Sequence, residues 1–227
     1  MKEQLANILQ TIQQSAEKAG RKPEDITLLA ASKYADVSQV QKAYDLGLRF
    51  FGENRSEGLL SKKDSLPDDI CWHFIGQLQT NKVKYIIDNV DLIHSLDRLS
   101  LATELQKRAL AKQTSVNALI EVCLDDREQR GGILPERLEA FLSECALFER
   151  IHIKGLMCVA PLGAAPAETE ACFAKMKDLF DGLSRVCPDN ASMEVLSMGM
   201  SHDYPLAIKH GATLVRIGSA LFQPNKN

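Results

Sequence analysis

Lys33 is the residue whose type and position most suggest covalent chemistry, because it ends the apolar run ITLLAASK. If this run is a buried strand, the amine lies partly out of water, and burial favours the neutral form of an amine. A neutral amine can attack an aldehyde and form a Schiff base with it. A lone lysine at a strand end is more commonly just solvated, so the neighbouring residues must decide between these interpretations.

The stretch LSMGMSHDYPLAIKHGATLVRIGS, residues 196–219, has the composition of a phosphate site. Gly199 permits a tight turn, and Ser201 stands where it could cap a short helix. Gly218 and Ser219 would add backbone amides and a hydroxyl, and the amides of helix N-termini bind phosphate. The same residues are equally well explained as turn glycines and a helix cap.

Arg216 interrupts an otherwise apolar run, so its charge must meet an acceptor if the run is buried. One candidate is an ion pair with Glu194 on the preceding strand, and the other is an acceptor on a ligand, such as a ring nitrogen. Asn54 and Ser197 also stand near the ends of apolar runs, and both are weaker candidates for ligand contact. Glu53 and Asn54 could instead cap the helix that follows them.

Eight short apolar runs, separated by amphipathic stretches, must position these residues. We expect strands over residues 26–33, 49–54, 71–77, 90–97, 116–125, 151–161, 193–201 and 213–222. Eight buried strands joined by crossover helices predict an α/β fold, a single (β/α)₈ TIM-type barrel. The alternative is a doubly wound open sheet, but its G-x-G-x-x-G motif does not follow the first strand. We expect one barrel domain over residues 1–227, with an extra N-terminal helix.

In such a barrel the chemistry lies at the carboxyl ends of the strands, so the candidate residues would all face one mouth. Phosphate is often bound by the loops after strands seven and eight, where residues 196–219 would lie. The segment Arg130-Gly131-Gly132 would form a loop that either folds over this mouth or only connects two elements.

The composition excludes several classes of function. The formal net charge is -3, and Lys and Arg are scattered, so we expect no nucleic-acid partner. No run approaches the roughly 20 apolar residues of a membrane span, and Leu5, Ile8, Leu9 and Ile12 have helical spacing instead of forming a signal-peptide core. Six cysteines without a C-x-x-C pair favour a reducing compartment, and the separated histidines favour no metal site. We expect a cytoplasmic protein.

The motifs ASK, FGEN, WHFIGxLQxNK, LIHSLD, GLM and LSMGMSxDxxxAIxxGATxVRIGSALF occur in this order between residues 26 and 222. In type and order, these motifs resemble those of the pyridoxal phosphate homeostasis proteins. That family is similar in fold to the barrel domain of alanine racemase and of the eukaryotic ornithine decarboxylase group. The resemblance implies pyridoxal 5'-phosphate as cofactor, bound as N6-(pyridoxal phosphate)lysine at Lys33. It implies phosphate contacts from Ser201, Gly218 and Ser219, a pyridine-nitrogen contact from Arg216, and pocket positions for Asn54 and Ser197. No residue is assigned a catalytic role.

The resemblance also implies a protein that carries or buffers the cofactor, passes it to apo-enzymes, and maintains vitamin B6 and amino acid homeostasis without robust catalysis. Arg216 favours this interpretation, since a guanidinium can only donate to an unprotonated ring nitrogen and leaves the ring a poorer electron sink. Racemisation needs two bases, of which Lys33 is the only evident one. Alanine racemase takes its second base from an additional domain of its partner subunit, so without such a domain we expect an open site and a monomer.

Two other activities stay open at this point. The first is a pyridoxal phosphate-dependent amino acid racemase or lyase. The second is a Schiff-base aldolase, which would cleave its substrate without any added cofactor.

Overall fold

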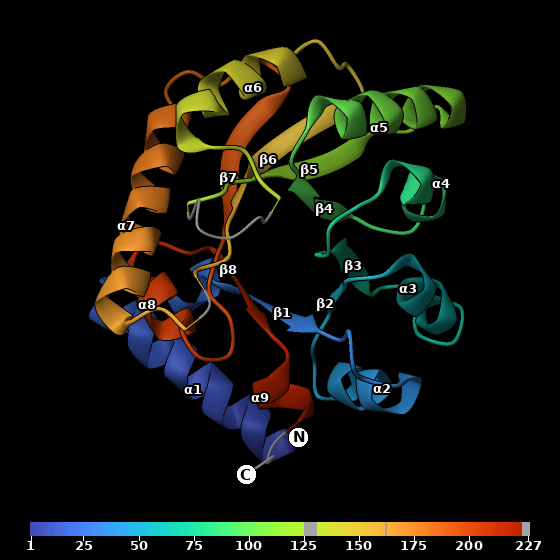
Figure 1. Ribbon diagram of the computed structural model, residues 1–227. Coiled ribbons are helices and arrows are strands. Elements are labelled where there is room, and N and C mark those ends of the chain that lie inside the picture. Colours follow the sequence, from blue (N-terminus) through green and yellow to red (C-terminus); the bar gives the residue numbers. More distant parts are fainter. Residues whose placement is uncertain (125–130, 162, 224–227) are drawn as a thin grey trace.

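In the computed structural model, which describes residues 1–124, 131–161 and 163–223, parallel strands close into a barrel in the order β1 to β8 (Figure 1). The strands are β1 Thr27–Ala31, β2 Phe50–Glu53, β3 Cys71–Phe74, β4 Leu92–Leu96, β5 Val116–Glu121, β6 Ile151–Met157, β7 Ala191–Ser197 and β8 Leu214–Ile217. The barrel closes where β1 pairs with β8, from Thr27↔Leu214 to Ala30↔Ile217. The predicted barrel is confirmed, and the open sheet is excluded.

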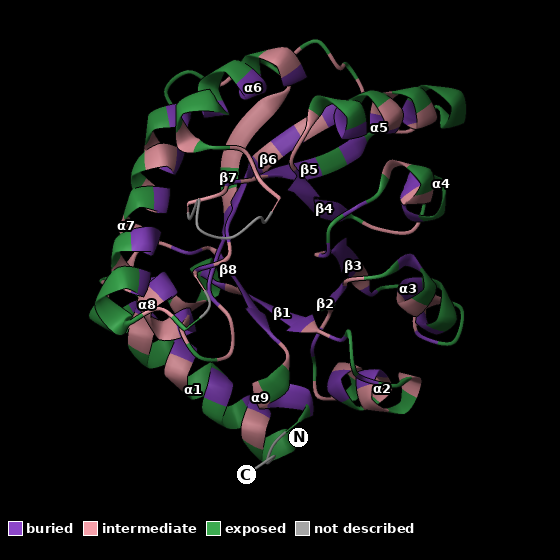
Figure 2. Cartoon of the chain, in the orientation of Figure 1, coloured by how far each residue is buried: buried purple, intermediate pink, exposed green. Residues whose placement is uncertain are grey.

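Helices alternate with the strands and cover the outside of the barrel (Figure 1). They are α1 Lys2–Lys18, α2 Val37–Asp45, α3 Ser56–Lys63, α4 Val83–Ile86, α5 Leu99–Lys112, α6 Leu138–Cys145, α7 Pro166–Leu183, α8 Tyr204–Lys209 and α9 Ser219–Phe222, with 3-10 turns at Pro23–Asp25, Thr80–Lys82 and Pro135–Arg137. Figure 2 shows β1, β3, β4 and β8 largely buried and β7 of intermediate burial over most of its length, while the helices expose one side to solvent. None of the helices within the described ranges is long and apolar enough to cross a membrane.

All eight strands end earlier than the apolar runs that predicted them. Leu78, Cys158 and Met198 follow their strands and are nevertheless fully buried. Apolar residues therefore continue into the loops that cover the barrel end, and hydrophobicity alone does not mark the last ladder hydrogen bond. The end of the eighth predicted strand, residues 219–222, forms the short helix α9 instead.

The predicted N-terminal helix is present as α1, which packs against α8 and α9. Its buried face consists of Leu5, Ile8, Ile12 and Ala16. Leu9, which we expected on this face, is 47% exposed because its position falls on the solvent side of the helix. Directly after α1, Arg21 donates hydrogen bonds to the carbonyls of Ile208 at 3.1 Å and Ala212 at 2.8 Å, which ties the helix to the α8 region.

Gly155 allows β6 and β7 to approach each other closely. Its φ is +143°, and a Cβ there would collide with the carbonyl of Val195. A side chain at this position would therefore meet both backbone strain and a steric clash. Gly182, on the exposed side of α7, would place a Cβ in open space.

Gly155→Ala should lower the free energy of unfolding by at least about 2 kcal/mol, because strain and overlap act together. Gly182→Ala is the matched control and should be neutral or stabilising by up to about 1 kcal/mol. Urea unfolding followed by circular dichroism measures both. Equal unfolding midpoints for the two variants would contradict the close approach of β6 and β7.

Candidate functional site

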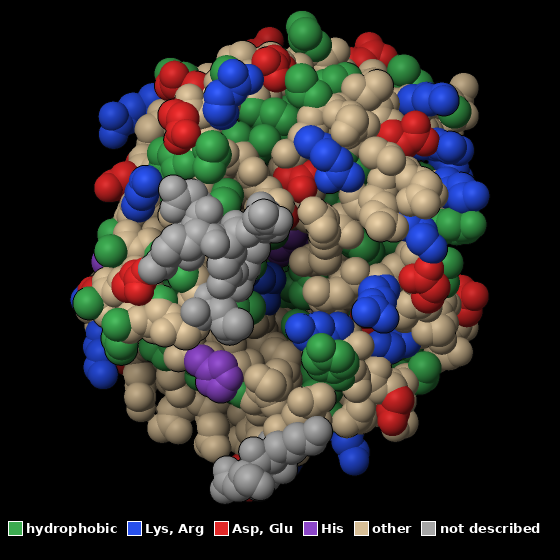
Figure 3. All heavy atoms as spheres, in the orientation of Figure 1, with side chains coloured by type: hydrophobic (Ala, Val, Ile, Leu, Met, Phe, Trp, Pro, Cys, Tyr) green, Lys and Arg blue, Asp and Glu red, His purple; other side chains and the backbone are tan. Residues whose placement is uncertain are grey.

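A cavity of about 300 Å³ lies at the carboxyl ends of the strands, a volume at the lower end of the roughly 300–1,000 Å³ of small-molecule pockets. The face seen in Figure 3, which looks down the barrel, is hollowed near its centre, and Lys and Arg side chains border the hollow. Six of the seven predicted residues line the cavity: Lys33, Asn54, Ser201, Arg216, Gly218 and Ser219. Residues far apart in the sequence thus meet at one site.

Lys33 lies in the turn after β1, and its side chain is exposed. The expectation of a partly buried amine at a strand end is wrong, because β1 stops at Ala31 and the turn carries Lys33 to the rim of the cavity. Its Nζ lies 4.9 Å from the centroid of the Tyr34 ring, within reach of a cation–π interaction. The amine is therefore accessible from solvent while it borders the cavity.

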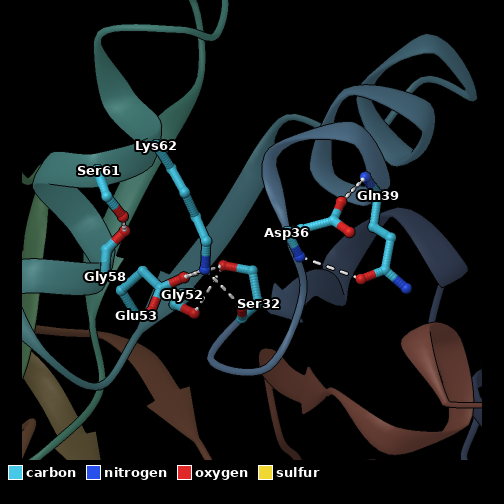
Figure 4. Close-up of polar contacts among 8 residues, drawn as sticks. All are labelled: Ser32, Asp36, Gln39, Gly52, Glu53, Gly58, Ser61 and Lys62. Carbon is cyan, nitrogen blue, oxygen red and sulfur yellow. Dashed lines mark hydrogen bonds and ion pairs between the residues drawn. The ribbon is translucent and has the colours of Figure 1, made fainter.

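A buried ion pair fixes the backbone next to Lys33 and Asn54 (Figure 4). Lys62 of α3 donates to Glu53 Oε1 at 2.5 Å and to the Ser32 carbonyl at 2.8 Å. The Ser32 hydroxyl donates to the same carboxylate oxygen at 2.7 Å. Glu53 does not cap the following helix, which has no side-chain cap, and instead joins α3 to the ends of β1 and β2.

Asn54 presents a buried oxygen to the site. Its Oδ1 has no hydrogen-bond partner among the described residues, and the residue lines the cavity. A buried carbonyl oxygen without a partner costs roughly 1–3 kcal/mol, so a ligand that donates to it would recover that free energy. The backbone here is tightly enclosed, because a Cβ at Gly76 would collide with the Asn54 carbonyl.

Ser201 connects two loops at the mouth, although it is not the helix cap that we expected. The N-cap of α8 is Asp203, whose carboxylate accepts from the Met200 N–H at 2.5 Å. The Ser201 hydroxyl instead accepts from the Ala220 N–H at 3.3 Å, in the first turn of α9. Gly199 has a φ of +88°, a left-handed backbone conformation that glycine adopts readily.

Gly218 and Ser219 stand at the start of α9. Gly218 is the N-cap and Ser219 the first helical residue, and both line the cavity. The first N–H groups of a helix have no partner within the helix, so this end supplies donors beside the cavity. Together with Ser201, the start of α9 suits an anion.

Arg216 is 6% exposed, and its guanidinium is held by neutral oxygens. It donates to the Ser197 carbonyl at 3.0 Å, to the Ser197 hydroxyl at 2.6 Å and to the Cys158 carbonyl at 2.9 Å. Burial lowers the pKa of Arg216 from its ordinary value. The ion pair with Glu194 that we considered is absent among the described residues, since Glu194 lies 3.5 Å from Lys154 instead.

Ser197 does not line the cavity, in contrast to our expectation. It is fully buried at the end of β7, and its hydroxyl contacts Arg216 and His94. Its place beneath the cavity follows from the alternation of side chains along a strand, which points Ser197 into the barrel. Ser197 therefore acts on the cavity indirectly, through its hydrogen bond with Arg216.

The cavity also contains residues that sequence reasoning missed. Tyr34 and His202 line it and are exposed, so Lys33 is not the only side chain there that can exchange a proton. Each directly follows a predicted residue, and that adjacency was the available signal. Other missed lining residues gave no chemical signal: Ala31, Ile75, Val159, Met200, Phe222 and Gln223.

The loop after β5 is described in part, and Arg130 lies outside the described residues. A Cβ on Gly131 would lie 2.8 Å from Asp97 Oδ2 and 3.0 Å from Gln77 Nε2. Gly131 therefore lies against the segments that follow β3 and β4, on the side of the barrel where the cavity lies. Within the described ranges, no group of three or more His, Cys, Asp or Glu side chains is arranged to hold a metal ion.

Comparison with known proteins assigns the chain to a family. A model of the alanine racemase N-terminal domain matches residues 4–226. The pyridoxal phosphate homeostasis protein of Aquifex aeolicus is 43% identical over 225 residues, which cover 99% of this chain and 98% of the relative. The chain belongs to the pyridoxal phosphate homeostasis protein family. The resemblance seen in the sequence motifs is thus confirmed over nearly the whole chain.

Solved structures agree with this family assignment. The structure of PipY from Synechococcus elongatus with PLP bound has a TM-score of 0.82 and 35% identity, and it covers 93% of this chain and 99% of PipY. An alanine racemase from Clostridium difficile is 14% identical with a TM-score of 0.68, and the match covers 96% of this chain and 57% of the racemase. At that identity the racemase shares the fold alone. The homeostasis family, in contrast, matches along its full length.

Lys62→Met should lower the free energy of unfolding by about 3–5 kcal/mol, because it leaves the Glu53 carboxylate buried without its cation. Lys82→Met is the matched control, since Lys82 pairs with Glu57 at 2.5 Å on the exposed surface and should contribute little. Thermal and urea unfolding compare the two variants. A combined Lys62→Met, Glu53→Leu variant should regain part of the loss, and equal effects of Lys62→Met and Lys82→Met would refute the role of the buried pair.

Proposed function

We propose that this protein binds pyridoxal 5'-phosphate on Lys33 and carries or buffers it, maintaining vitamin B6 and amino acid homeostasis without robust catalysis. The observation that carries the proposal is one cavity that brings an accessible lysine together with a buried arginine. The curated relatives are named pyridoxal phosphate homeostasis proteins, and PipY was solved with PLP bound. These names support the same cofactor here.

The residues around the cavity fit the chemical groups of this cofactor. The amine of Lys33 suits the aldehyde, and the anion site formed by Ser201, Gly218 and Ser219 suits the phosphate. Arg216 would donate to the pyridine nitrogen, since a guanidinium has no lone pair to offer. The unpartnered Asn54 Oδ1 suits a donor on the ligand, such as its ring hydroxyl. When bound, the cofactor supplies an electrophilic carbonyl and an electron-withdrawing ring.

Exposure of the lysine favours a carrier over a catalyst. Carbanion chemistry on such a cofactor benefits from a site closed to water, whereas exchange needs access to the lysine. Lys33 is exposed, and Tyr34 beside it is 73% exposed. Transfer to apo-enzymes would take place at this open side, and we propose that they are transient partners.

The proposal also covers the cellular compartment and the oligomeric state of the protein. The six cysteines contain no C-x-x-C pair, which fits a reducing compartment, and we place the protein in the cytoplasm. We propose that it acts as a monomer with one barrel domain, because six of the seven predicted cofactor contacts already meet in one cavity without a residue from a partner.

Purified protein mixed with pyridoxal phosphate should develop the visible absorbance of a lysine Schiff base, and borohydride reduction should fix the adduct on Lys33. Lys33→Ala should lose both the band and the adduct at this position, while the exposed Lys18→Ala keeps them. Absorbance and peptide mass analysis provide the readouts. A wild-type adduct on another lysine would refute Lys33, and the absence of any adduct would refute the cofactor.

Loaded protein should transfer its cofactor to an apo-enzyme and should not racemise L-alanine at a measurable rate. Recovery of the acceptor enzyme's activity measures transfer, and chiral chromatography of the incubated amino acid measures racemisation. Robust racemisation would support the alternative, an amino acid racemase or lyase. In that case Tyr34→Phe and His202→Gln would identify which cavity residue serves as the second base.

A further inference from the structure

A chain of hydrogen bonds runs from Arg216 through the barrel interior. The guanidinium donates to the Ser197 hydroxyl at 2.6 Å, and that hydroxyl lies 3.1 Å from His94 Nδ1. His94 Nε2 lies 2.9 Å from His73 Nδ1. The four residues come from four strands, β8, β7, β4 and β3, so the chain crosses the barrel beneath the cavity.

The donor at one end determines the direction of the whole chain. Arg216 can only donate, so the Ser197 oxygen accepts and its hydroxyl proton must find another acceptor. Among the described residues that acceptor is His94 Nδ1. His94 then carries its proton on Nε2 and donates to His73 Nδ1. Every bond of the chain points away from Arg216, an arrangement in which consecutive bonds strengthen one another.

Burial keeps both histidines neutral, and the chain of hydrogen bonds requires neutral rings. His94 is fully buried and His73 is 5% exposed. Burial holds the pKa of His94 well below its ordinary value, with further lowering by His73 and Arg216, and burial lowers the pKa of His73 to about 4. At neutral pH each ring therefore has one donor and one acceptor nitrogen.

We propose that Ser197, His94 and His73 are positioning residues that hold the Arg216 guanidinium in the orientation that serves the cavity. The inference rests on the proposed function, in which Arg216 donates to the pyridine nitrogen. A long arginine side chain has many rotamers, and the two Ser197 oxygens and the Cys158 carbonyl select one of them. The histidines act through Ser197 by fixing its hydroxyl as an acceptor toward Arg216.

Ser197→Ala removes one of the three acceptors of Arg216, the hydroxyl, and with it the donor to His94. We expect roughly tenfold to hundredfold weaker binding of pyridoxal phosphate, the range for losing a hydrogen bond to a charged group. The pyridine ¹⁵N chemical shift of labelled cofactor should also change, which a loss of stability alone would not cause. Titration and NMR of the loaded protein measure the two effects.

Ser95→Ala is the matched control. Ser95 follows His94 on β4, so its side chain points to the opposite face of the strand. It is equally buried, and its hydroxyl has no hydrogen-bond partner among the described residues. The change should leave cofactor affinity and the ¹⁵N shift unaltered. Equal affinities and shifts for Ser197→Ala and Ser95→Ala would overturn the proposal.

Two further measurements work on protein without cofactor. NMR of ¹⁵N-histidine should show both His94 and His73 as Nε2–H tautomers, and an Nδ1–H tautomer at His94 would overturn the direction of the chain. The guanidinium of Arg216 should rotate slowly in wild type and faster in Ser197→Ala. If wild type binds no pyridoxal phosphate, the proposed function fails. The histidine tautomers and the rotation rate of Arg216 still decide in that case whether the chain of hydrogen bonds orients Arg216.

A pair of histidine variants covers the case in which Ser197→Ala does not fold. His94→Gln keeps one acceptor and one donor and should preserve slow rotation of Arg216. His94→Leu has neither and should permit faster rotation. The proposal is overturned if the Arg216 guanidinium rotates as slowly in both variants as in wild type.

Discussion

The burial of one guanidinium inside the barrel constrains much of the structure. Arg216 is 6% exposed, and an arginine cannot escape its charge by losing a proton as a buried lysine can. Its N–H groups must therefore meet oxygens at fixed positions. The carbonyls at the ends of β6 and β7 and the Ser197 hydroxyl provide them. The ends of three strands are thus held in register around one side chain that also borders the cavity.

A second buried charged group, the Lys62–Glu53 pair, lies at the ends of β1 and β2 and is satisfied differently. Lys62 and Glu53 neutralise each other and have no polar contact with the cavity-lining side chains that the structure describes. Their effect is to fix Ser32 and Glu53, the neighbours of Lys33 and Asn54 in the chain. Arg216 donates its hydrogen bonds to neutral oxygens and lines the cavity, with Glu121 and Asp203 also favouring its charge, whereas Lys62 is paired with a carboxylate and supports the backbone. Both arrangements hold backbone at strand ends that lie next to cavity-lining residues.

Most of the fold, but only part of the site, could be predicted from the sequence. Eight apolar runs were sufficient to predict the barrel, because each run is separated by an amphipathic helix. Strand ends were not predictable, since residues such as Leu78 are as buried in loops as in strands. Arg216 was recognisable because a charge in an apolar run needs a partner. The position of Ser197 beneath the cavity, and the pairing of Glu53 with Lys62, depend on strand direction and helix packing that no short pattern records.

The contrast between a fixed pocket and an exposed lysine bears on what such a site can do. A catalyst gains by enclosing its reactive group, since preorganised surroundings stabilise a transition state best when water is excluded. Here the groups suited to the phosphate and the ring are anchored by helix α9 and by buried hydrogen bonds, while Lys33 stands in a turn beside an exposed Tyr34. Under the proposed function, the anchored groups would select the ligand, and the exposed amine would let it enter and leave. That division of roles suits a protein whose task is to hold an aldehyde reversibly.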